Sequence, residues 1–234
     1  MIKMKLKKLF FIKMSRELEP IVKKYIIVGD SGVGKTNIIY RFVNGDFQHD
    51  LEATIGLEFT IKEYKIEEKT FNLHLYDTGG AEHYGALRQN YYYNADFAII
   101  VYDITKRETF NSIDNWIREC EYSHNENLIK ILVGNKTDLA KEKREVTEEE
   151  GKDLAERYGI DFYETSALEG FNIEKIFKDS CTKEYSNSLE NNSNEENQLE
   201  GLSKFDGWKG EKLITLDNDN KEKKIIRHKS CCFH

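Results

Sequence analysis

The stretch GDSGVGKT, residues 29–36, decides the fold of this chain. It follows the apolar run of residues 25–28 and precedes a segment of helical period, the context that a phosphate-binding loop requires. The glycines let successive backbone N–H groups point at phosphate oxygens, and the helix N-terminus adds partial positive charge. Lys35 can then reach the β- and γ-phosphates, while the Thr36 hydroxyl faces a magnesium ion. Alone, the loop also fits an ATPase or a nucleotide kinase.

Short apolar runs alternate with segments of helical period from residue 25 to about residue 183. This alternation is typical of a mostly parallel sheet with helices on both faces. Only four residues separate the second run from the third, too few for a crossover helix, so these two strands should form an antiparallel hairpin. We therefore expect an α/β fold with a six-stranded mixed sheet, its strands at residues 25–28, 57–66, 71–76, 97–102, 129–133 and 161–163.

Capping residues predict where three of the helices begin. Thr105 with Glu108 and Thr147 with Glu150 each place a hydroxyl at the N-cap and a carboxylate three residues later, the pattern of a capping box. A last helix should follow Asn172, whose side chain can cap it. Its apolar face is expected at Ile173, Ile176, Phe177 and Cys181.

Composition places the chain among soluble, globular proteins. It has 234 residues, of which 33% are charged and 39% hydrophobic, and a formal net charge of −7. A surface that binds nucleic acid needs a concentrated excess of Lys and Arg, so we expect no nucleic-acid partner. Four cysteines are too few and too unevenly spaced for a disulfide framework, which favours a reducing compartment.

The first fourteen residues, MIKMKLKKLFFIKM, are basic and apolar. Their uninterrupted apolar run, residues 9–12, is far shorter than a signal-peptide core or a membrane span, so secretion is not expected. Two interpretations stay open: an unstructured basic extension, with Met14 as an alternative start, or a weak amphipathic contact with a membrane.

Two short motifs indicate guanine as the base. Asn135, Lys136 and Asp138 belong to an NKTD stretch that follows an apolar strand, where ligands bind in open α/β sheets. The Asp138 carboxylate can accept hydrogen bonds from the guanine N1–H and 2-amino group, whereas adenine has no matching donors. The alternative is a polar turn. Thr165, Ser166 and Ala167 follow the next strand and form a turn whose N–H groups can meet the guanine oxygen.

A second group of residues suits magnesium and the γ-phosphate. Asp77 ends the third strand, where it can hold magnesium through a water, and the Gly80 N–H can approach the γ-phosphate. Thr54 can ligate the same ion only when a γ-phosphate draws its loop inward. Two segments held by one phosphate relax when it is lost, which predicts a switch that partner proteins can read.

With these motifs in place, residues 21–181 resemble a Rab-type member of the Ras superfamily of small GTPases. Besides the nucleotide motifs, residues 55–59, 91–95 and 100–105 resemble stretches of that family. The resemblance implies a P-loop small G-protein fold, GTP hydrolysis, GTP or GDP with Mg²⁺ as ligands, and stacking of Phe47 on the guanine ring. The candidate nucleotide-binding residues are Gly29, Asp30, Ser31, Gly32, Val33, Gly34, Lys35, Thr36, Phe47, Thr54, Gly80, Asn135, Lys136, Asp138, Ser166 and Ala167; the candidate metal-binding residues are Thr36, Thr54 and Asp77.

The second switch departs from the family pattern. Members usually read DTAGQE, whereas residues 77–82 read DTGGAE, so Ala81 stands where a glutamine orients the attacking water. We assign Lys35, Thr54, Gly80 and this substituted position to catalysis. Because alanine cannot hydrogen-bond water, we expect hydrolysis slowed by about 10²- to 10³-fold. Glu82, His83 or a glutamine supplied by a partner protein are alternatives that would restore it.

The C-terminus resembles the paired-cysteine endings on which Rab proteins carry geranylgeranyl groups. Cys231 and Cys232 are the candidate lipid attachment sites, and two lipids anchor a protein stably where one does not. The alternative is a pair of free thiols. We expect a basic extension over residues 1–20, a G domain over 21–184 and a disordered tail over 185–234. The resemblance implies exchange factors, GTPase-activating proteins and effectors as partners, at the cytosolic face of intracellular membranes with a cytosolic pool.

Overall fold

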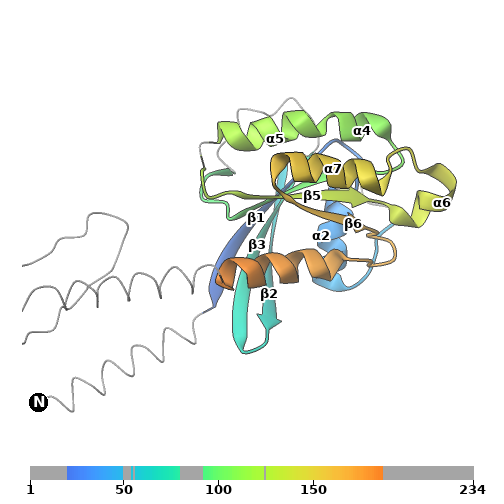
Figure 1. Ribbon diagram of the computed structural model, residues 1–234. Helices are drawn as coiled ribbons and strands as arrows, with labels where there is room; N and C mark the ends of the chain where they lie inside the picture. The colour runs from blue at the N-terminus through green and yellow to red at the C-terminus, as the bar shows by residue number, and fades with distance from the viewer. Residues whose placement is uncertain (1–19, 50–53, 55, 80–91, 124, 187–234) are drawn as a thin grey trace, which may run out of the picture. The chain divides into compact units, whose positions relative to one another are not determined.

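The computed structural model describes residues 20–49, 54, 56–79, 92–123 and 125–186. Six strands form one sheet in the order β2-β3-β1-β4-β5-β6 (Figure 1). All neighbouring strands run parallel except β2 and β3, which are antiparallel. The sheet is therefore mixed and mostly parallel, as the sequence predicts. The strands are β1 Ile21–Val28, β2 Leu57–Ile66, β3 Lys69–Thr78, β4 Phe97–Asp103, β5 Ile129–Asn135 and β6 Asp161–Thr165.

Helices cover both faces of the sheet and bury two apolar clusters (Figure 1). One face packs against α2 and a helix over residues 173–186; the other packs against α5 and α7. None of the described helices is long and apolar enough to cross a bilayer. The named helices are α2 Lys35–Asn44, α4 Arg107–Asn111, α5 Ile113–Tyr122, the short 3-10 helix η2 Thr137–Leu139, α6 Ala140–Lys143 and α7 Glu148–Tyr158.

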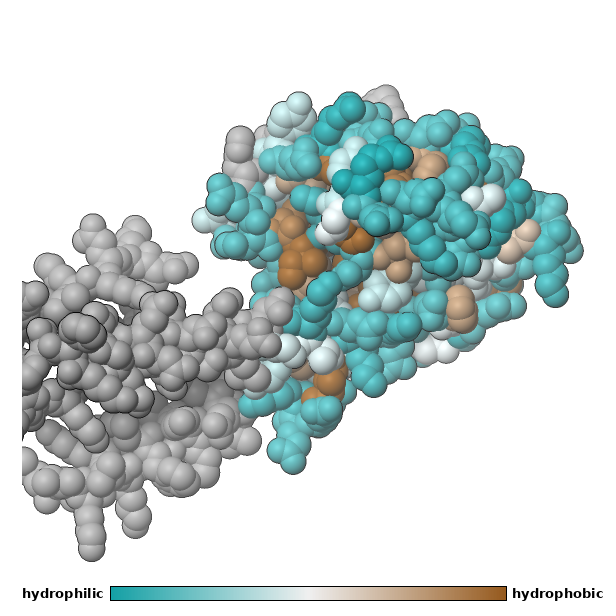
Figure 2. All heavy atoms as spheres, in the orientation of Figure 1, coloured by the Kyte–Doolittle hydropathy of each residue, from teal (hydrophilic) through white to brown (hydrophobic). Residues whose placement is uncertain are grey.

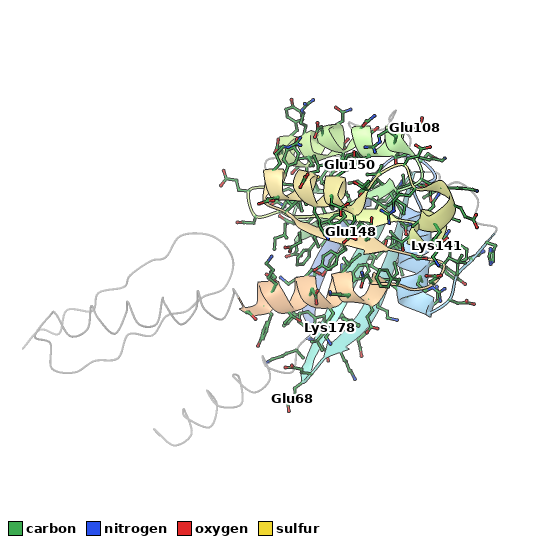
Figure 3. The ribbon with its side chains drawn as sticks, turned by 45° about the vertical axis from the view of Figure 1, so that its right-hand side comes forward. Glu68, Glu108, Lys141, Glu148, Glu150 and Lys178 are labelled. Carbon is green, nitrogen blue, oxygen red and sulfur yellow. The ribbon has the colours of Figure 1, made fainter. Side chains whose placement is uncertain are left out.

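The β2–β3 hairpin is tighter than expected. Ile66 pairs with Lys69, so the loop consists of Glu67 and Glu68 alone, and Glu67 adopts a φ of 52°. A positive φ matches the twist that two-residue hairpin loops need. Glu68 lies at the tip of the hairpin, as Figure 3 shows.

One of the three predicted helix starts is wrong, and the last helix begins after Asn172 as predicted but without the predicted cap. The capping box at Thr147 and Glu150 is confirmed at the start of α7. The one at Thr105 is wrong: α4 begins at Arg107, and the Thr105 hydroxyl donates to Asp103 Oδ1 at 2.7 Å. The Asn172 amide donates to the Glu164 carbonyl at 2.9 Å instead of capping the last helix. Ile173, Ile176, Phe177 and Cys181 are buried as predicted.

The outer surface is mainly hydrophilic on the face shown in Figure 2, with a few hydrophobic side chains between the helices. The apolar residues are concentrated in the central strands, and every residue of β4 is buried. A strand buried on both faces reads as a continuous apolar run, which is why β4 is visible in the sequence. This rigid centre fixes the loops that follow its strands.

Candidate functional site

The candidate site lies at the edge of the sheet where the parallel strands end. β1, β3, β4, β5 and β6 all bring their carboxyl ends to this edge, and ligands bind there in open α/β sheets. A cavity of about 310 Å³ opens between the loops after β1, β5 and β6 and the segment that follows α2. Its lining includes Gly32, Gly34, Asn37, Phe47, His49, Asn135, Lys136, Asp138, Ala167 and Leu168.

The phosphate loop after β1 needs glycine at two positions. A Cβ on Gly29 would lie 2.2 Å from the Val101 carbonyl oxygen, and one on Gly34 would lie 2.5 Å from the Asn135 amide nitrogen. Both glycines also have a positive φ, 140° and 97°. α2 begins immediately afterwards at Lys35, so its N-terminus faces the cavity. In this loop Ser31 is exposed and Val33 is buried.

The Lys35 side chain folds back over the phosphate loop. Only 5% of it is exposed, and its ammonium donates to the carbonyls of Gly29 at 2.8 Å and Asp30 at 2.9 Å. A buried ammonium among carbonyl oxygens provides a concentrated positive charge at the phosphate-binding edge.

The three predicted magnesium ligands meet at the other end of the phosphate loop. The Thr36 hydroxyl donates to Asp77 Oδ2 at 2.6 Å and lies 2.8 Å from the Thr54 hydroxyl. Thr54 itself lies 3.4 Å from the same carboxylate oxygen. Three oxygen donors from α2, β3 and the intervening loop therefore converge, the kind of donor set that a small hard cation prefers.

Asp77 shows that this cluster fits a cation. The residue is 3% exposed, and its Oδ1 is buried with no hydrogen-bond partner among the described residues. Burial raises the pKa of the carboxyl above its ordinary value, although the Thr36 hydrogen bond and the Lys35 charge act in the opposite direction. A buried, incompletely paired carboxylate costs folding free energy. A divalent cation would satisfy it.

At the base end, Asn135 joins three loops. Its side-chain amide donates to the Val33 carbonyl at 2.9 Å, while its Oδ1 accepts from the Thr165 hydroxyl at 3.1 Å and the Ala167 N–H at 3.3 Å. The residue is fully buried. Asn135 therefore positions the phosphate loop and the turn after β6 relative to each other.

Asp138 and Lys136 complete the base end. Asp138 is half-buried and accepts a hydrogen bond from the Ser166 hydroxyl at 2.6 Å, which fixes the carboxylate beside the cavity. The Lys136 ammonium donates to the Gly32 carbonyl at 2.7 Å and forms a 2.7 Å ion pair with Asp103. Phe47 lies across the cavity, with the His49 ring 4.9 Å away and edge-on to it. Gly80 and Ala81 lie outside the described residues.

Comparison with known proteins agrees with this geometry. The Ras family model matches residues 24–186. The chain belongs to the Ras family and is a Rab-type small GTPase. Similar proteins include Ras-related protein Rab2BV of Beta vulgaris, 45% identical over 162 residues that cover 69% of this chain and 75% of the relative. Ras-related protein Rab11C of Lotus japonicus is 43% identical over 69% of this chain and 74% of its own length. Ras-related protein Rab11A of Lotus japonicus is 39% identical over 193 residues, which cover 82% of this chain and 84% of the relative.

Three residues of this Rab-type chain contribute to the site without having been predicted. Asp103 is the last residue of β4 and Asp77 is the last but one of β3, so the position of Asp103 at the end of an apolar strand is a usable signal. Trp116 on α5 donates its indole N–H to Asp30 at 2.8 Å, and Arg41 on α2 donates to the turn after β6. These last two lie on helices at ordinary amphipathic positions, which gave no signal of a role at the site.

Proposed function

We propose that this chain is a guanine-nucleotide switch that recruits effector proteins at the cytosolic face of intracellular membranes during vesicle traffic, with a cytosolic pool. Membership of the Ras family supports a GTP-hydrolysing protein that uses guanine nucleotides and Mg²⁺. One observation carries the assignment: a single sheet edge holds the Asp138 carboxylate at one end and the Thr36, Thr54 and Asp77 oxygens at the other. That arrangement suits a nucleotide with a base at one end and a magnesium-bound phosphate at the other.

Each group has a defined task in this proposal. Asp138 accepts hydrogen bonds from the guanine edge, Phe47 stacks on the ring, and the loop N–H groups with Lys35 bind the phosphates. Thr36 and Thr54 would ligate Mg²⁺ directly and Asp77 through a water. Bound there, the ion neutralises charge on the β- and γ-phosphates.

The switch itself is supported by direct contact between its two segments. The Gly79 N–H donates to the Gly56 carbonyl at 2.8 Å, and a Cβ on Gly79 would lie 2.6 Å from the Thr54 carbonyl oxygen. Gly79, the residue after β3, therefore lies against Gly56 and Thr54, which precede β2. Because the two are in contact, loss of the γ-phosphate would release them together, an order-to-disorder change that effectors can read.

Ala81 makes slow intrinsic hydrolysis the finer part of the proposal. A methyl group cannot orient the attacking water, and phosphoryl transfer depends mostly on positioning and electrostatics. Single-turnover GTP hydrolysis measured on the protein and on Ala81→Gln tests this. We expect Ala81→Gln to be about 10²- to 10³-fold faster. Similar rates for the two proteins would defeat the idea, and Glu82→Ala and His83→Ala variants would then identify a substitute residue.

A GTP-binding scaffold that scarcely hydrolyses is the second candidate, and Ala81 is the feature that favours it. If the chain is a cycling switch, a partner protein that inserts its own glutamine would restore GTP hydrolysis. If the chain is a scaffold, no partner would accelerate hydrolysis. Hydrolysis measured with extract from the native cell separates the two. We expect acceleration by the extract; GTP that persists in its presence would favour the scaffold.

Membrane attachment through Cys231 and Cys232 is a further part of the proposal, which rests on the sequence because both lie outside the described residues. Lys221, Lys223, Lys224, Arg227 and Lys229 precede or flank the pair and would each add about 1 kcal/mol near anionic lipid. We propose a G domain over residues 21–184, preceded by a basic extension and followed by a segment that carries these two cysteines; residues 1–19 and 187–234 lie outside the described residues. Mass spectrometry of protein from its native cell tests the lipids; unmodified cysteines would contradict them.

A further inference from the structure

Arg41 joins the two walls of the base cavity without lining the cavity itself. It lies in the last turn of α2, and its guanidinium donates to three backbone carbonyls. Nε donates to Ala167 at 2.8 Å, Nη2 donates to Leu168, and Nη1 donates to Gly45 at 2.9 Å. Ala167 and Leu168 line the cavity on one side. Gly45 begins the segment that carries Phe47, which lines the cavity on the other side.

The turn after β6 closes around this guanidinium. Ser166 and Phe171 pair across the turn, with the Ser166 N–H donating to the Phe171 carbonyl at 3.2 Å. Gly170 lies at a φ of 76°, and a Cβ added there would be 3.7 Å from Arg41 Cδ. Gly170 therefore lies close to Arg41, within the turn that accepts the hydrogen bonds of its guanidinium.

Arg41 is connected to the base-reading carboxylate through this turn. The Ser166 hydroxyl donates to Asp138 at 2.6 Å and accepts from the Glu169 N–H at 3.0 Å. At the C-terminal end of α2, the Gly45 N–H donates to the Arg41 carbonyl at 2.9 Å. Gly45 caps the helix in a left-handed conformation. A continuous set of bonds thus runs from Asp138 through the turn and Arg41 to the segment before Phe47.

The chemistry of arginine suits this position. A planar guanidinium has five donors in a fixed fork, so it can bind carbonyls from three directions at once, whereas a lysine ammonium is a single point. Its positive charge also lies near the C-terminal end of α2, where the helix dipole favours a cation. All three recorded acceptors are backbone carbonyls of loops, so the side chain fixes loop positions and not another side chain.

We propose that Arg41 is a positioning residue for the base, which sets how long the chain holds a guanine nucleotide by keeping the Phe47 wall and the 166–168 turn at a fixed separation. The inference rests on the proposed function, because it requires that the cavity holds guanine. Removing the guanidinium lets the two walls separate, while the magnesium cluster at Thr36, Thr54 and Asp77 keeps its own contacts.

The test is the release rate of radiolabelled GDP from the full-length protein, measured with excess unlabelled GDP. We expect Arg41→Gln to release GDP roughly tenfold faster than the wild type, about 1.4 kcal/mol, and Arg41→Lys to lie between the two. EDTA should accelerate release by the same factor in all three proteins, because the magnesium ligands are untouched. The lysine variant keeps the test decisive if the glutamine variant fails to fold.

Arg107→Gln is the matched control. Arg107 also donates to a backbone carbonyl, that of Glu145, and to the Glu150 carboxylate at 2.7 Å, but it does not line or brace the cavity. We expect a lower melting temperature and an unchanged release rate. An Arg41→Gln rate within roughly twofold of the wild type, or equal acceleration in Arg107→Gln, would overturn the inference. A wild-type chain that binds no GDP would overturn the proposed function itself, and would be seen before any variant is compared.

Discussion

The base end and the magnesium end of the cavity are stabilised in opposite ways. At the base end, Asn135, Asp138 and Arg41 connect the loops through hydrogen bonds within the protein. At the magnesium end, Asp77 keeps a buried oxygen that no described residue satisfies. The first arrangement is held by bonds between the loops themselves, whereas the second contains a buried carboxylate oxygen that a cation would satisfy. A switch needs this difference, since one end must retain the nucleotide while the other responds to the γ-phosphate.

Changing the base-reading carboxylate should have the largest effect. In Asp138→Asn the amide presents a donor where the carboxylate accepted from guanine, so guanine is rejected and xanthine, with a carbonyl at that position, is accepted. The asparagine oxygen can still accept from Ser166, which leaves the turn in place. We expect the preference for GDP over xanthosine diphosphate to change by about 10⁴-fold.

Competition calorimetry with nucleotide-stripped protein measures this preference. Asp153→Asn, an exposed aspartate on α7, is the control for loss of one negative charge. An unchanged preference in Asp138→Asn would mean that the cavity does not read the base through this carboxylate.

At the opposite end, Asp77→Asn should stabilise the nucleotide-free protein while abolishing its response to magnesium. Burial raises the pKa of Asp77, so folding favours the protonated form and the charged form costs stability as pH rises through that pKa. A neutral amide removes the cost. In EDTA at neutral pH we expect a melting temperature higher by about 2–4 °C for each kcal/mol recovered. The advantage should disappear below the ordinary carboxyl pKa of 3.8, where the aspartate is itself protonated.

With Mg²⁺ and GDP present, the order of the two proteins should reverse, because only the wild type gains the metal. Scanning fluorimetry with and without Mg²⁺ measures both conditions. If the wild type and Asp77→Asn have the same melting temperature in EDTA, the Asp77 carboxylate does not destabilise the nucleotide-free protein. The contrast between the two ends of the cavity would then be wrong. Loss of stability in both conditions would instead assign Asp77 a purely structural role.

The sequence predicted the parts of the site that follow strands. Asp77 and Asn135 lie at the carboxyl ends of β3 and β5, and the loops that follow β1, β5 and β6 lead to Lys35, Asp138 and Ser166. The carboxyl ends of parallel strands meet at one edge of the sheet. The antiparallel hairpin could be predicted because too few residues separate its two strands for a crossover helix. What could not be predicted depends on where a helix lies over the sheet. Arg41 bonds to Ala167 and Leu168, which lie 126 and 127 positions later in the sequence, and Trp116 bonds to Asp30, which lies 86 positions earlier.

The error at Thr105 has a related cause. A hydroxyl followed three residues later by a glutamate satisfies the local pattern of a capping box. In the structure, the buried Asp103 carboxylate accepts from both the Thr105 N–H and its hydroxyl, at 2.9 and 2.7 Å. A buried carboxylate needs donors more than a helix end exposed to water does. The helix therefore begins one residue later than predicted, with Lys106 at the N-cap and Arg107 as its first residue.

The α7 capping box gives the smallest predicted effect and separates stability from nucleotide retention. Glu150 accepts from Arg107 and from the Thr147 N–H, and it lies where α7 begins, facing α4 (Figure 3). The Arg107 hydrogen bonds lower the pKa of Glu150 from 4.5 to about 2, and the Thr147 backbone bond contributes in the same direction. A lowered carboxyl pKa means that the stabilisation is complete above 4.5 and is lost as pH falls toward 2. Glu150→Gln should therefore lower the urea midpoint slightly at neutral pH, with the difference from the wild type shrinking across that window.

Glu149→Gln is the matched control, since Glu149 occupies the same first turn of α7 but is exposed and takes no part in the capping box. We expect it to leave the midpoint nearly unchanged, and we expect neither variant to alter the release of GDP. A faster release in Glu150→Gln would show that the packing of α7 is transmitted to the cavity. In that case the two ends described above would not be independent of the rest of the domain, and retention of the nucleotide would depend on global stability and not on local contacts such as those of Arg41.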